Sequence, residues 1–518
     1  MKRLLVIFLI AMIVVSSFAS CMSASVEGDS SSKKDKTENK DDKDDKDDKD
    51  DKDDTEAVDT EEDDFSDDEQ SESLDSEDTS DEENIESSDT ETSTEIVDNS
   101  DTEKDTETES KTETESKTET EKESEKETEK PTFNVKESTA GLKFELNADG
   151  LSYTLVDRGT ASKTAEIVID GHKGLPVTKI GYGVFDNSVR KDTAITKVTI
   201  GDYVEEIDDY AFSHCSKITS IKMGNGVKVI GLGAFRYCSA LTSISLSKSL
   251  EYIDDSAFYK STKLASITIP NTVKYIGDYA FDNTAYYDTA GNWVKNALYV
   301  GNYLIALKTD SSGTVNVKDG TITIACNALD SCTKVTKVVI PNSVKHIGAE
   351  AFTGCTALAA VTMGTGIESC GENAFYKTKF YNTSANWTNN VLYAGKCLIA
   401  ARTSLSGTYT VQAGTTVIAD CAFAGCESLS AVNMSSELKT IGQYAFMGCT
   451  NLSSVTIKSG IKTIKPRAFK NCVKLTSVTL PSYTGWKVDG EAITDTLATK
   501  TDAAVLLVSL LADKTWTK

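Results

Sequence analysis

The chain has 518 residues, and its formal net charge of −27 is distributed unevenly along the sequence. Residues 22–130 hold 48 acidic and 14 basic residues, whereas residues 131–518 hold 33 acidic and 38 basic residues. The second part is therefore close to neutral, and it lacks the dense basic surface that a nucleic-acid-binding domain needs. We expect no nucleic acid partner.

Residues 1–21 have the three parts of a secretory signal peptide. Lys2 and Arg3 form a basic start, a 12-residue apolar run covers residues 4–15, and small residues precede Cys21. The apolar run is too short for a comfortable membrane span. Its end resembles a bacterial lipobox, although Phe18 departs from the usual leucine. We expect lipidation of Cys21, so that the chain contacts a membrane only through its N-terminal lipid. The alternative is ordinary signal cleavage and secretion.

Residues 22–130 consist mainly of Asp, Glu, Lys, Ser and Thr, with isolated apolar residues. Such a segment cannot bury enough apolar surface to offset chain entropy, and its like charges favour extended conformations. We predict a disordered acidic stalk that carries a folded domain away from a membrane or through a wall. Calcium capture by the Asp runs is the alternative, but lysines interrupt these runs and no calcium-loop spacing is present.

Residues 131–194 are predicted to form an N-terminal cap and the first coil of a repeat array. Residues 141–157 alternate apolar and polar side chains around a turn at 147–150, which indicates a hairpin. Residues 165–185 form a first, imperfect repeat. A cap at this end would cover core and strand edge that the array otherwise exposes.

Residues 195–482 repeat with a period of 23, as in ITKVTIGDYVEEIDDYAFSHCSK followed by ITSIKMGNGVKVIGLGAFRYCSA. A fixed period in the twenties indicates a solenoid. In each coil we expect a short strand, a turn, an opposite wall formed by V-x-x-I-G, and an anchoring residue inside. The anchor recurs eleven times, which predicts about eleven coils: Phe185, Phe212, Phe235, Phe258, Phe281, Leu329, Phe352, Phe375, Phe423, Phe446 and Phe469.

Two of the gaps between anchors are 48 residues long, and they align with each other at an offset of 94. We predict a β-hairpin insert in each gap, near residues 284–312 and 378–406. The inserts are rich in Tyr and Trp, which often anchor binding interfaces. The alternative is that these side chains form the small cores of the inserts. The candidate ligand-binding residues are Tyr286, Trp293, Tyr299, Tyr303, Tyr381, Trp387 and Tyr393.

Seven of the twelve cysteines share one repeat position, three residues after the anchor. A buried free cysteine behaves as a small apolar residue, so we predict reduced, buried thiols at this position. Disulfides between successive coils are the alternative. The seven are Cys215, Cys238, Cys332, Cys355, Cys426, Cys449 and Cys472.

Residues 483–518 are predicted to form a C-terminal cap. Residues 503–512 are apolar with helical spacing, but a membrane span would need about 20 such residues. We therefore expect a helix that covers the last coil.

The frame I-G-x-x-A-F-x-x-C-x-x-L-x-x-I-x-[IL]-P, the W…LY-x-G-x-x-LIA inserts and the TGWKVDG…DKTWTK ending resemble the BspA-type leucine-rich repeats of bacterial surface proteins. The match covers about residues 141–516. The resemblance implies a right-handed leucine-rich solenoid at the bacterial cell surface. It also implies a role in adhesion, through binding of host extracellular proteins or partner-cell proteins.

The fold class we expect is thus a mainly β repeat solenoid with two hairpin inserts, preceded by a disordered acidic tail. No catalytic, metal-binding or cofactor-binding constellation is found: His172, His214 and His346 lack Cys or His neighbours at ligand spacing. We expect a surface adhesin without enzymatic activity that binds an extracellular protein. A glycan-binding module is the alternative, because Ser and Thr recur on the outward strand positions. A degradative enzyme is the third possibility, and the oligomeric state is open.

Overall fold

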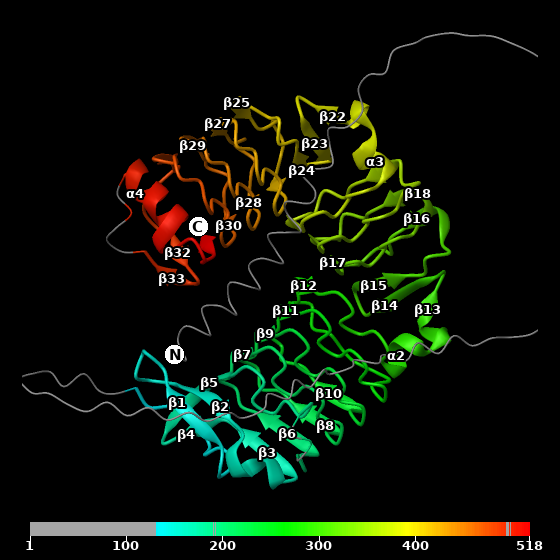
Figure 1. Ribbon diagram of the computed structural model, residues 1–518, viewed down its shortest axis with the longest axis vertical. Helices are drawn as coiled ribbons and strands as arrows, with labels where there is room; N and C mark the ends of the chain where they lie inside the picture. The colour runs from blue at the N-terminus through cyan, green and yellow to red at the C-terminus, as the bar shows by residue number, and fades with distance from the viewer. Residues whose placement is uncertain (1–130, 190, 192, 494–496, 498) are drawn as a thin grey trace, which may run out of the picture. The chain divides into compact units, whose positions relative to one another are not determined.

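The computed structural model describes residues 131–518, except 190, 192, 494–496 and 498 (Figure 1). The expected signal peptide at 1–21, the lipidation site Cys21 and the acidic stalk at 22–130 all lie outside the described residues.

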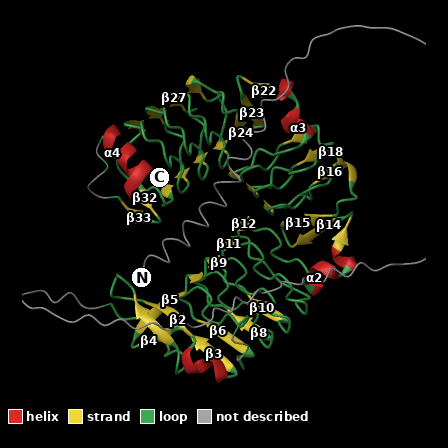
Figure 2. Ribbon diagram, in the orientation of Figure 1, coloured by secondary structure: helices red, strands yellow, loops and turns green. Residues whose placement is uncertain are grey.

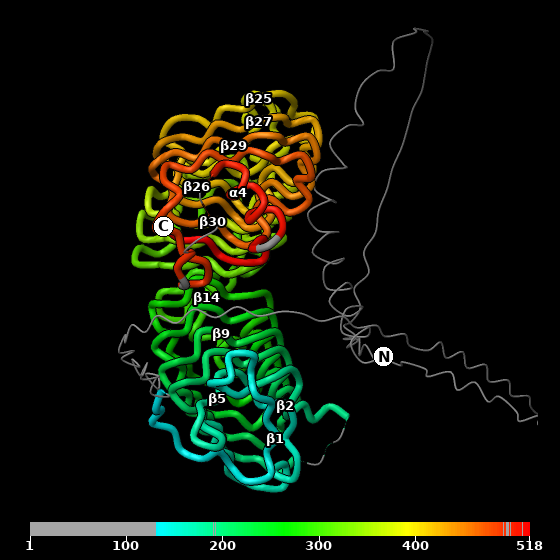
Figure 3. The backbone as a smooth tube through the Cα atoms, turned by 90° about the vertical axis from the view of Figure 1, so that its left-hand side faces the viewer, coloured from blue at the N-terminus to red at the C-terminus, as the bar shows by residue number. Residues whose placement is uncertain are grey.

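The described chain winds into coils whose short parallel strands form two columns (Figures 1 and 2). Neighbouring strands pair at an offset of one repeat, as in Ser220 with Ser243 and Ile230 with Ile253. Figure 3 shows the successive turns of the backbone running side by side. The first column contains β3 (Glu166–Ile169), β6 (Lys197–Ile200), β8 (Ser220–Lys222), β10 (Ser243–Ser245), β16 (Ser312–Asn316), β18 (Lys334–Val339), β20 (Ala360–Thr362), β25 (Gly407–Thr410), β27 (Leu429–Asn433), β29 (Ser454–Thr456) and β31 (Ser477–Thr479).

The second column is the V-x-x-I wall. Eleven of its strands precede an anchoring residue, and β2, β15 and β24 bring the array to about 14 turns in the described part of the chain. The sequence indicated eleven turns, because the turns were counted from the anchoring residues and β2, β15 and β24 precede no anchor. The strands are β2 (Tyr153–Asp157), β5 (Leu175–Ile180), β7 (Glu206–Ile207), β9 (Val229–Ile230), β11 (Tyr252–Ile253), β12 (Tyr275–Ile276), β15 (Tyr303–Leu307), β17 (Thr323–Ile324), β19 (His346–Ile347), β21 (Ser369–Cys370), β24 (Cys397–Ala401), β26 (Val417–Ile418), β28 (Thr440–Ile441) and β30 (Thr463–Ile464).

The N-terminal end of the array is covered by residues 136–172. β1 (Lys143–Leu146) forms an antiparallel hairpin with β2, a short 3-10 helix η1 (Gly159–Lys163) follows, and β4 (Gly171–His172) pairs with β5. The hydroxyl groups of Ser138 and Thr139 accept hydrogen bonds from the backbone amides of Asp170 and Val168. These bonds satisfy the free edge of β3, which would otherwise remain open to pairing with another strand.

Each insert is built into the wall of the solenoid. The first contains α2 (Ala285–Asp288), η2 (Ala290–Asn292), β13 (Trp293–Val294) and β14 (Ala297–Val300) before β15. The second contains α3 (Lys379–Asn382), η3 (Ser384–Asn386), β22 (Trp387–Thr388) and β23 (Val391–Ala394) before β24. In both, the last strand of an antiparallel meander also pairs in parallel with the next wall strand, β17 or β26. The insert therefore adds a turn to the stack.

The C-terminal segment closes the other end. β32 (Lys487–Val488) and β33 (Glu491–Ala492) form a hairpin, and β34 (Trp516–Thr517) lies antiparallel between β30 and β32. The predicted helix is present as α4 (Lys500–Val505), which continues as one π-helical turn, η4 (Leu506–Leu510). A capping box between Thr499 and Asp502 fixes its first turn. The edge of β30 is thus paired with β34.

The core follows the repeat. Strand side chains alternate, so that Val198 and Ile200 are buried while Lys197 and Thr199 are exposed. The anchoring phenylalanines are fully buried and stack from coil to coil, with ring centroids 4.8 Å apart for Phe185 and Phe212. The predicted fold class, a mainly β solenoid of about 23-residue coils, is confirmed. The seven ladder cysteines are buried and free, as predicted.

Candidate functional site

The first insert holds its tryptophan half-exposed on the surface. Thr284 begins α2 as its N-cap and accepts a hydrogen bond from the amide of Tyr287. The Trp293 indole donates to the backbone oxygen of Tyr287 at 2.7 Å, and the two rings meet edge to face at 5.2 Å. The Lys308 ammonium lies 5.3 Å from the centre of the Trp293 ring. The insert thus presents a fixed indole with a cation over it.

The second insert repeats this arrangement 94 residues later. Thr378 caps α3, and the Trp387 indole donates to the backbone oxygen of Tyr381 at 2.6 Å. The Tyr381 and Trp387 rings are 5.1 Å apart, again edge to face. The Arg402 guanidinium lies 4.7 Å from the Trp387 ring centre. We call these two surfaces the insert patches, formed by Tyr287, Trp293 and Lys308 and by Tyr381, Trp387 and Arg402.

The other candidate tyrosines use their hydroxyl groups inside the protein. Tyr286 donates to the backbone oxygen of Tyr299 at 2.7 Å, and the Tyr299 hydroxyl accepts from the Lys318 amide at 3.0 Å. Tyr303 is fully buried and donates to the Pro270 carbonyl at 2.6 Å. The Tyr393 hydroxyl lies 2.9 Å from that of Tyr409. The structure brings Tyr286 and Tyr299 together, whereas Tyr303 lies in the core and faces the preceding coil.

Burial keeps the tyrosines of the insert patches protonated. It raises the pKa of Tyr287 to about 12, with nearby Asp282 adding to the effect. It raises the pKa of Tyr381 to about 12 as well. These phenols are neutral at physiological pH, so the charge of each patch is that of its Lys or Arg.

Sequence reasoning missed Lys308 and Arg402, and it did not place Tyr287 among the candidate ligand-binding residues. A signal for the two cations was present, because Lys308 and Arg402 align at the same offset of 94 as the tryptophans. In the sequence, a basic residue at an outward position resembles any other solvated surface residue. Only the fold of the insert places it over the indole.

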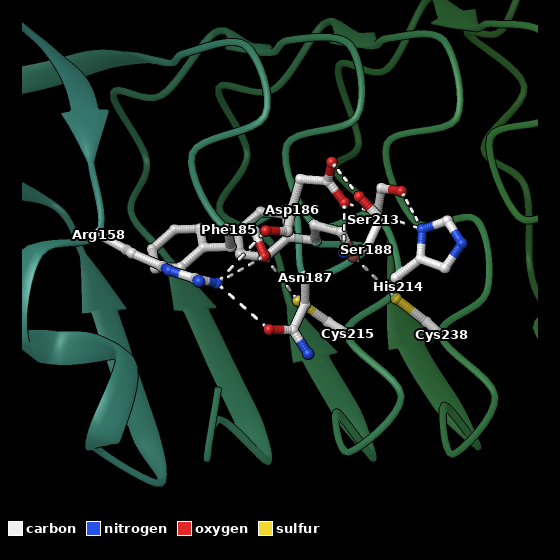
Figure 4. A network of polar contacts seen from close by, with 10 residues as sticks. Arg158, Phe185, Asp186, Asn187, Ser188, Ser213, His214, Cys215 and Cys238 are labelled. Carbon is white, nitrogen blue, oxygen red and sulfur yellow. Dashed lines mark hydrogen bonds and ion pairs between the residues drawn. The ribbon is translucent and has the colours of Figure 1, made fainter. Parts of the chain in front are cut away.

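A polar network lies where the cap meets the first coils (Figure 4). The Arg158 side chain is buried, and its Nη1 atom donates to the backbone oxygens of Phe185 and Asp186, both at 3.4 Å. The Asp186 carboxylate accepts from the Ser188 hydroxyl at 2.9 Å and lies 3.8 Å from His214 Nδ1. This network satisfies backbone oxygens at the end of the anchor stack, which is a structural role.

The three histidines lie apart, in different settings. His172 stacks on Phe144, and His214 stacks on Tyr237. His346 lies 2.9 Å from the Ser369 hydroxyl, and burial lowers its pKa to about 4. Among the described residues, no group of three or more His, Cys, Asp or Glu side chains is arranged to hold a metal ion. Within the same residues, no helix has both the length and the apolar character that crossing a membrane requires.

The first-column hydroxyl groups include several that are used between coils. Thr219 donates to the Thr196 carbonyl, and Thr242 donates to the Thr219 carbonyl, both at 3.1 Å. Ser220 and Ser243, one position further along, face outward on β8 and β10. Some hydroxyl groups on the first-column side therefore join neighbouring coils, whereas others face the solvent.

The family model for the BspA type leucine rich repeat region matches six copies, over residues 171–288, 322–409 and 401–489. No curated protein gives a significant match. A leucine-rich repeat protein from Bacteroides ovatus is 22% identical, with 67% of this chain and 88% of that chain covered and a TM-score of 0.26. A leucine rich cell surface protein from Faecalibacterium prausnitzii is 23% identical, with 67% and 95% covered and a TM-score of 0.22. The pneumococcal vaccine antigen PcpA is 15% identical, with 65% and 92% covered and a TM-score of 0.24. The family model spans more than half of the 518 residues, and the chain therefore belongs to the BspA-type leucine-rich repeat family.

Proposed function

We propose that the chain is a surface adhesin that binds an extracellular protein through its two insert patches. The observation that carries the proposal is the repetition of one pair, a partly buried Trp with an exposed cation, on two inserts 94 residues apart, Trp293 with Lys308 and Trp387 with Arg402. Trp, Tyr and Arg are the residues that most often dominate the binding energy of protein interfaces.

The geometry of the insert patches favours a protein ligand over a glycan. A sugar ring binds tryptophan by lying flat on the indole, but Lys308 and Arg402 each lie over one indole face. The cations are instead placed to pair with carboxylates around an apolar contact, which is the usual arrangement of a protein interface.

Two similar patches on one scaffold support bivalent binding. When one patch is bound, the second meets its ligand at an effective concentration set by the spacing of the two sites. An adhesin that contacts a repeated or multimeric protein would gain affinity in this way without any further contact.

The same proposal places the protein outside the cell. Members of the BspA-type family are bacterial surface proteins. Export through residues 1–21 and lipidation of Cys21 would hold the solenoid at the surface, and secretion is the alternative. Metabolic lipid labelling and cell fractionation of the wild type and Cys21→Ala separate the two: loss of both label and membrane association in the variant supports the anchor.

Binding of the full chain to immobilised matrix proteins, mucins and partner cells tests the function. Lys308→Ala/Arg402→Ala keeps both tryptophans and should weaken saturable binding, and Trp293→Ala/Trp387→Ala should weaken it further. Lys222→Ala/Lys248→Ala removes the same charge from exposed first-column surface and serves as the matched control. Absence of saturable binding by the wild type would sink the proposal. Glycan binding that survives the Trp substitutions would favour the hydroxyl-rich strand face.

A further inference from the structure

A second cluster, whose side chains are all partly buried, lies on the turns that follow three consecutive anchors. The tyrosine–cation cluster consists of Arg236, Tyr237, Tyr259, Lys260 and the ring of His214. The Arg236 guanidinium lies 5.0 Å from the Tyr237 ring centre and 5.8 Å from that of Tyr259, and the Lys260 ammonium lies 5.3 Å from both. Two cations and two phenols from adjacent coils thus converge at one place.

The rings form a rigid frame for the cations. His214 stacks on Tyr237 at 4.4 Å, and Tyr237 meets Tyr259 edge to face at 5.8 Å. Burial alone would raise the pKa of Tyr237, but hydrogen bonds from Arg236 and Lys260 lower it below its usual value.

The positive charge of the cluster is not neutralised within the described part of the chain. Elsewhere on the solenoid, exposed lysines pair across coils, as Lys228 does with Glu205 at 2.9 Å and Lys274 with Glu251 at 2.7 Å. Neither Arg236 nor Lys260 forms such an ion pair with a described carboxylate, and the Nε atom of Arg236 is buried without a hydrogen-bond partner. The cluster is therefore able to accept an external anion.

At these positions the backbone has a left-handed conformation, which glycine adopts more easily than residues with a side chain. His214, Tyr237 and Lys260 have φ angles of 56°, 57° and 56°, in the left-handed region. At the same repeat position, later coils place Gly354, Gly425 and Gly448, but also Asn283, Ser331, Lys377 and Asn471, all at positive φ. The left-handed backbone at this position is therefore a property of the repeat, which accepts residues other than glycine there.

A similar grouping of cations and a tyrosine, at other positions of the repeat, lies at the C-terminal end of the solenoid and contacts a carboxylate. Arg467 and Lys470 lie 5.7 and 5.9 Å from the ring centre of Tyr444, which matches the distances around Tyr259. There the Arg467 Nε atom donates to the Asp513 carboxylate, and the Arg467 amide donates to the Ala512 carbonyl. One Arg–Lys–Tyr arrangement of this chain thus pairs, through its arginine, with a single carboxylate, that of Asp513, which Ala512 and Lys514 flank in the chain.

We propose that the tyrosine–cation cluster binds an acidic polypeptide segment of a partner protein, whose carboxylates take the place that Asp513 takes beside Arg467. Arg236 and Lys260 pair with the carboxylates, and the hydroxyl groups of Tyr237 and Tyr259 supply further donors. The cluster lies on the turns of adjacent coils, and its side chains are partly buried. It is a site separate from the insert patches.

Titration of the full chain with poly-L-glutamate tests the proposal. Arg236→Gln/Lys260→Gln should weaken binding on the order of tenfold, and the remaining binding should depend less on salt concentration. Lys222→Gln/Lys248→Gln is the charge-matched control and should bind as the wild type does. Residues 22–130 are present in every variant, so competition from their acidic side chains is constant.

Tyr237→Gly provides a second, independent variant. It removes the ring and relaxes the backbone at φ 57°, so it should lose binding without a lower melting temperature. Trp293→Ala/Trp387→Ala should leave poly-L-glutamate binding unchanged, which separates this site from the insert patches. No binding by the wild type, or equal binding by Arg236→Gln/Lys260→Gln, would overturn the proposal. So would dextran sulfate binding that alone depends on the cluster, because it would assign the cluster to a glycan.

Discussion

The thiol of Cys238 donates a hydrogen bond to the backbone oxygen of Phe212 in the preceding coil, with 3.3 Å between sulfur and oxygen. The same bond joins Cys215 to Phe185 at 3.2 Å and Cys472 to Phe446 at 3.0 Å. Ser261 occupies this position in one coil and donates to the Phe235 oxygen at 2.9 Å. In these coils the ladder residue is therefore a small donor that satisfies the buried carbonyl of an anchor, in addition to its apolar packing.

This relationship predicts different effects for two substitutions of one cysteine. Cys238→Ala leaves the Phe212 carbonyl without its donor and should destabilise the protein by about 1–3 kcal/mol. Cys238→Ser keeps a donor, as Ser261 does naturally, and should cost less. Urea unfolding of both variants is the measurement. Equal losses for Ala and Ser would show that only the volume of the side chain matters.

The anchors should carry much of the stability, coil by coil. Phe352 is fully buried and stacks on Phe375 at 4.9 Å, so Phe352→Ala should cost about 3–5 kcal/mol. Because each coil contacts only its neighbours, the loss should be local. Hydrogen exchange should accelerate in β17, β19 and β21 and stay unchanged in β7 and β9. Uniform acceleration along the array would contradict a nearest-neighbour description. Lys337→Ala, at an exposed strand position, is the control.

The C-terminal strand should protect the last coils. Trp516 is buried and lies edge to face with Trp486 at 6.1 Å, and its strand pairs with β30. Trp516→Ala should cost about 3–5 kcal/mol and expose the edge of β30, which then becomes able to pair with other chains. Hydrogen exchange at β30 and light scattering measure the two effects. Unchanged protection of β30 would show that β34 is not the cap.

Stability should rise as the pH falls from 7 towards 5. Burial raises the pKa of Asp254, Asp278 and Asp282 to about 6, so the folded state binds more protons than the unfolded state between about pH 4 and 6. The stabilisation that these protons provide is present at low pH and is lost as the pH rises through 6. His346 acts in the opposite direction, because burial lowers its pKa to about 4 and its protonation opposes folding.

Urea midpoints measured at pH 5 and pH 7.5 test this balance. Three carboxyl groups outweigh one imidazole, so the wild type should be more stable at pH 5. The triple variant Asp254→Asn/Asp278→Asn/Asp282→Asn should lose most of this gain, because the three carboxyl groups with the largest raised pKa values are then absent. A wild type that is more stable at pH 7.5 would contradict the assignment.

Much of the fold was predictable because the repeat is local. The 23-residue period places each Phe anchor and each ladder cysteine at a fixed position, and stacking then follows from burial. The integration of the inserts was not predictable in the same way. Tyr303 was a candidate for ligand binding, yet β15 pairs with β17 and brings its hydroxyl to Pro270 in the preceding coil. That contact depends on long-range pairing, which no local pattern reports.

The candidate surfaces were partly visible in the sequence. The two tryptophans stood out by residue type and offset, whereas Lys308, Arg236 and Lys260 resembled ordinary solvated residues at variable positions. Their role depends on stacking, because Arg236 meets Tyr259 only when the coils lie side by side. Alignment of the coils by position would have shown that these residues lie near each other, but it would not have shown how their side chains are oriented.

Binding of the full-length wild type and of Trp293→Ala, Trp387→Ala and the double variant to one immobilised extracellular protein ligand tests the central claim most directly. Each single variant should lose the avidity of bivalent contact, on the order of 10²-fold, and the double variant should lose saturable binding. Equal affinity of all four proteins would contradict the assignment of adhesion to the insert patches.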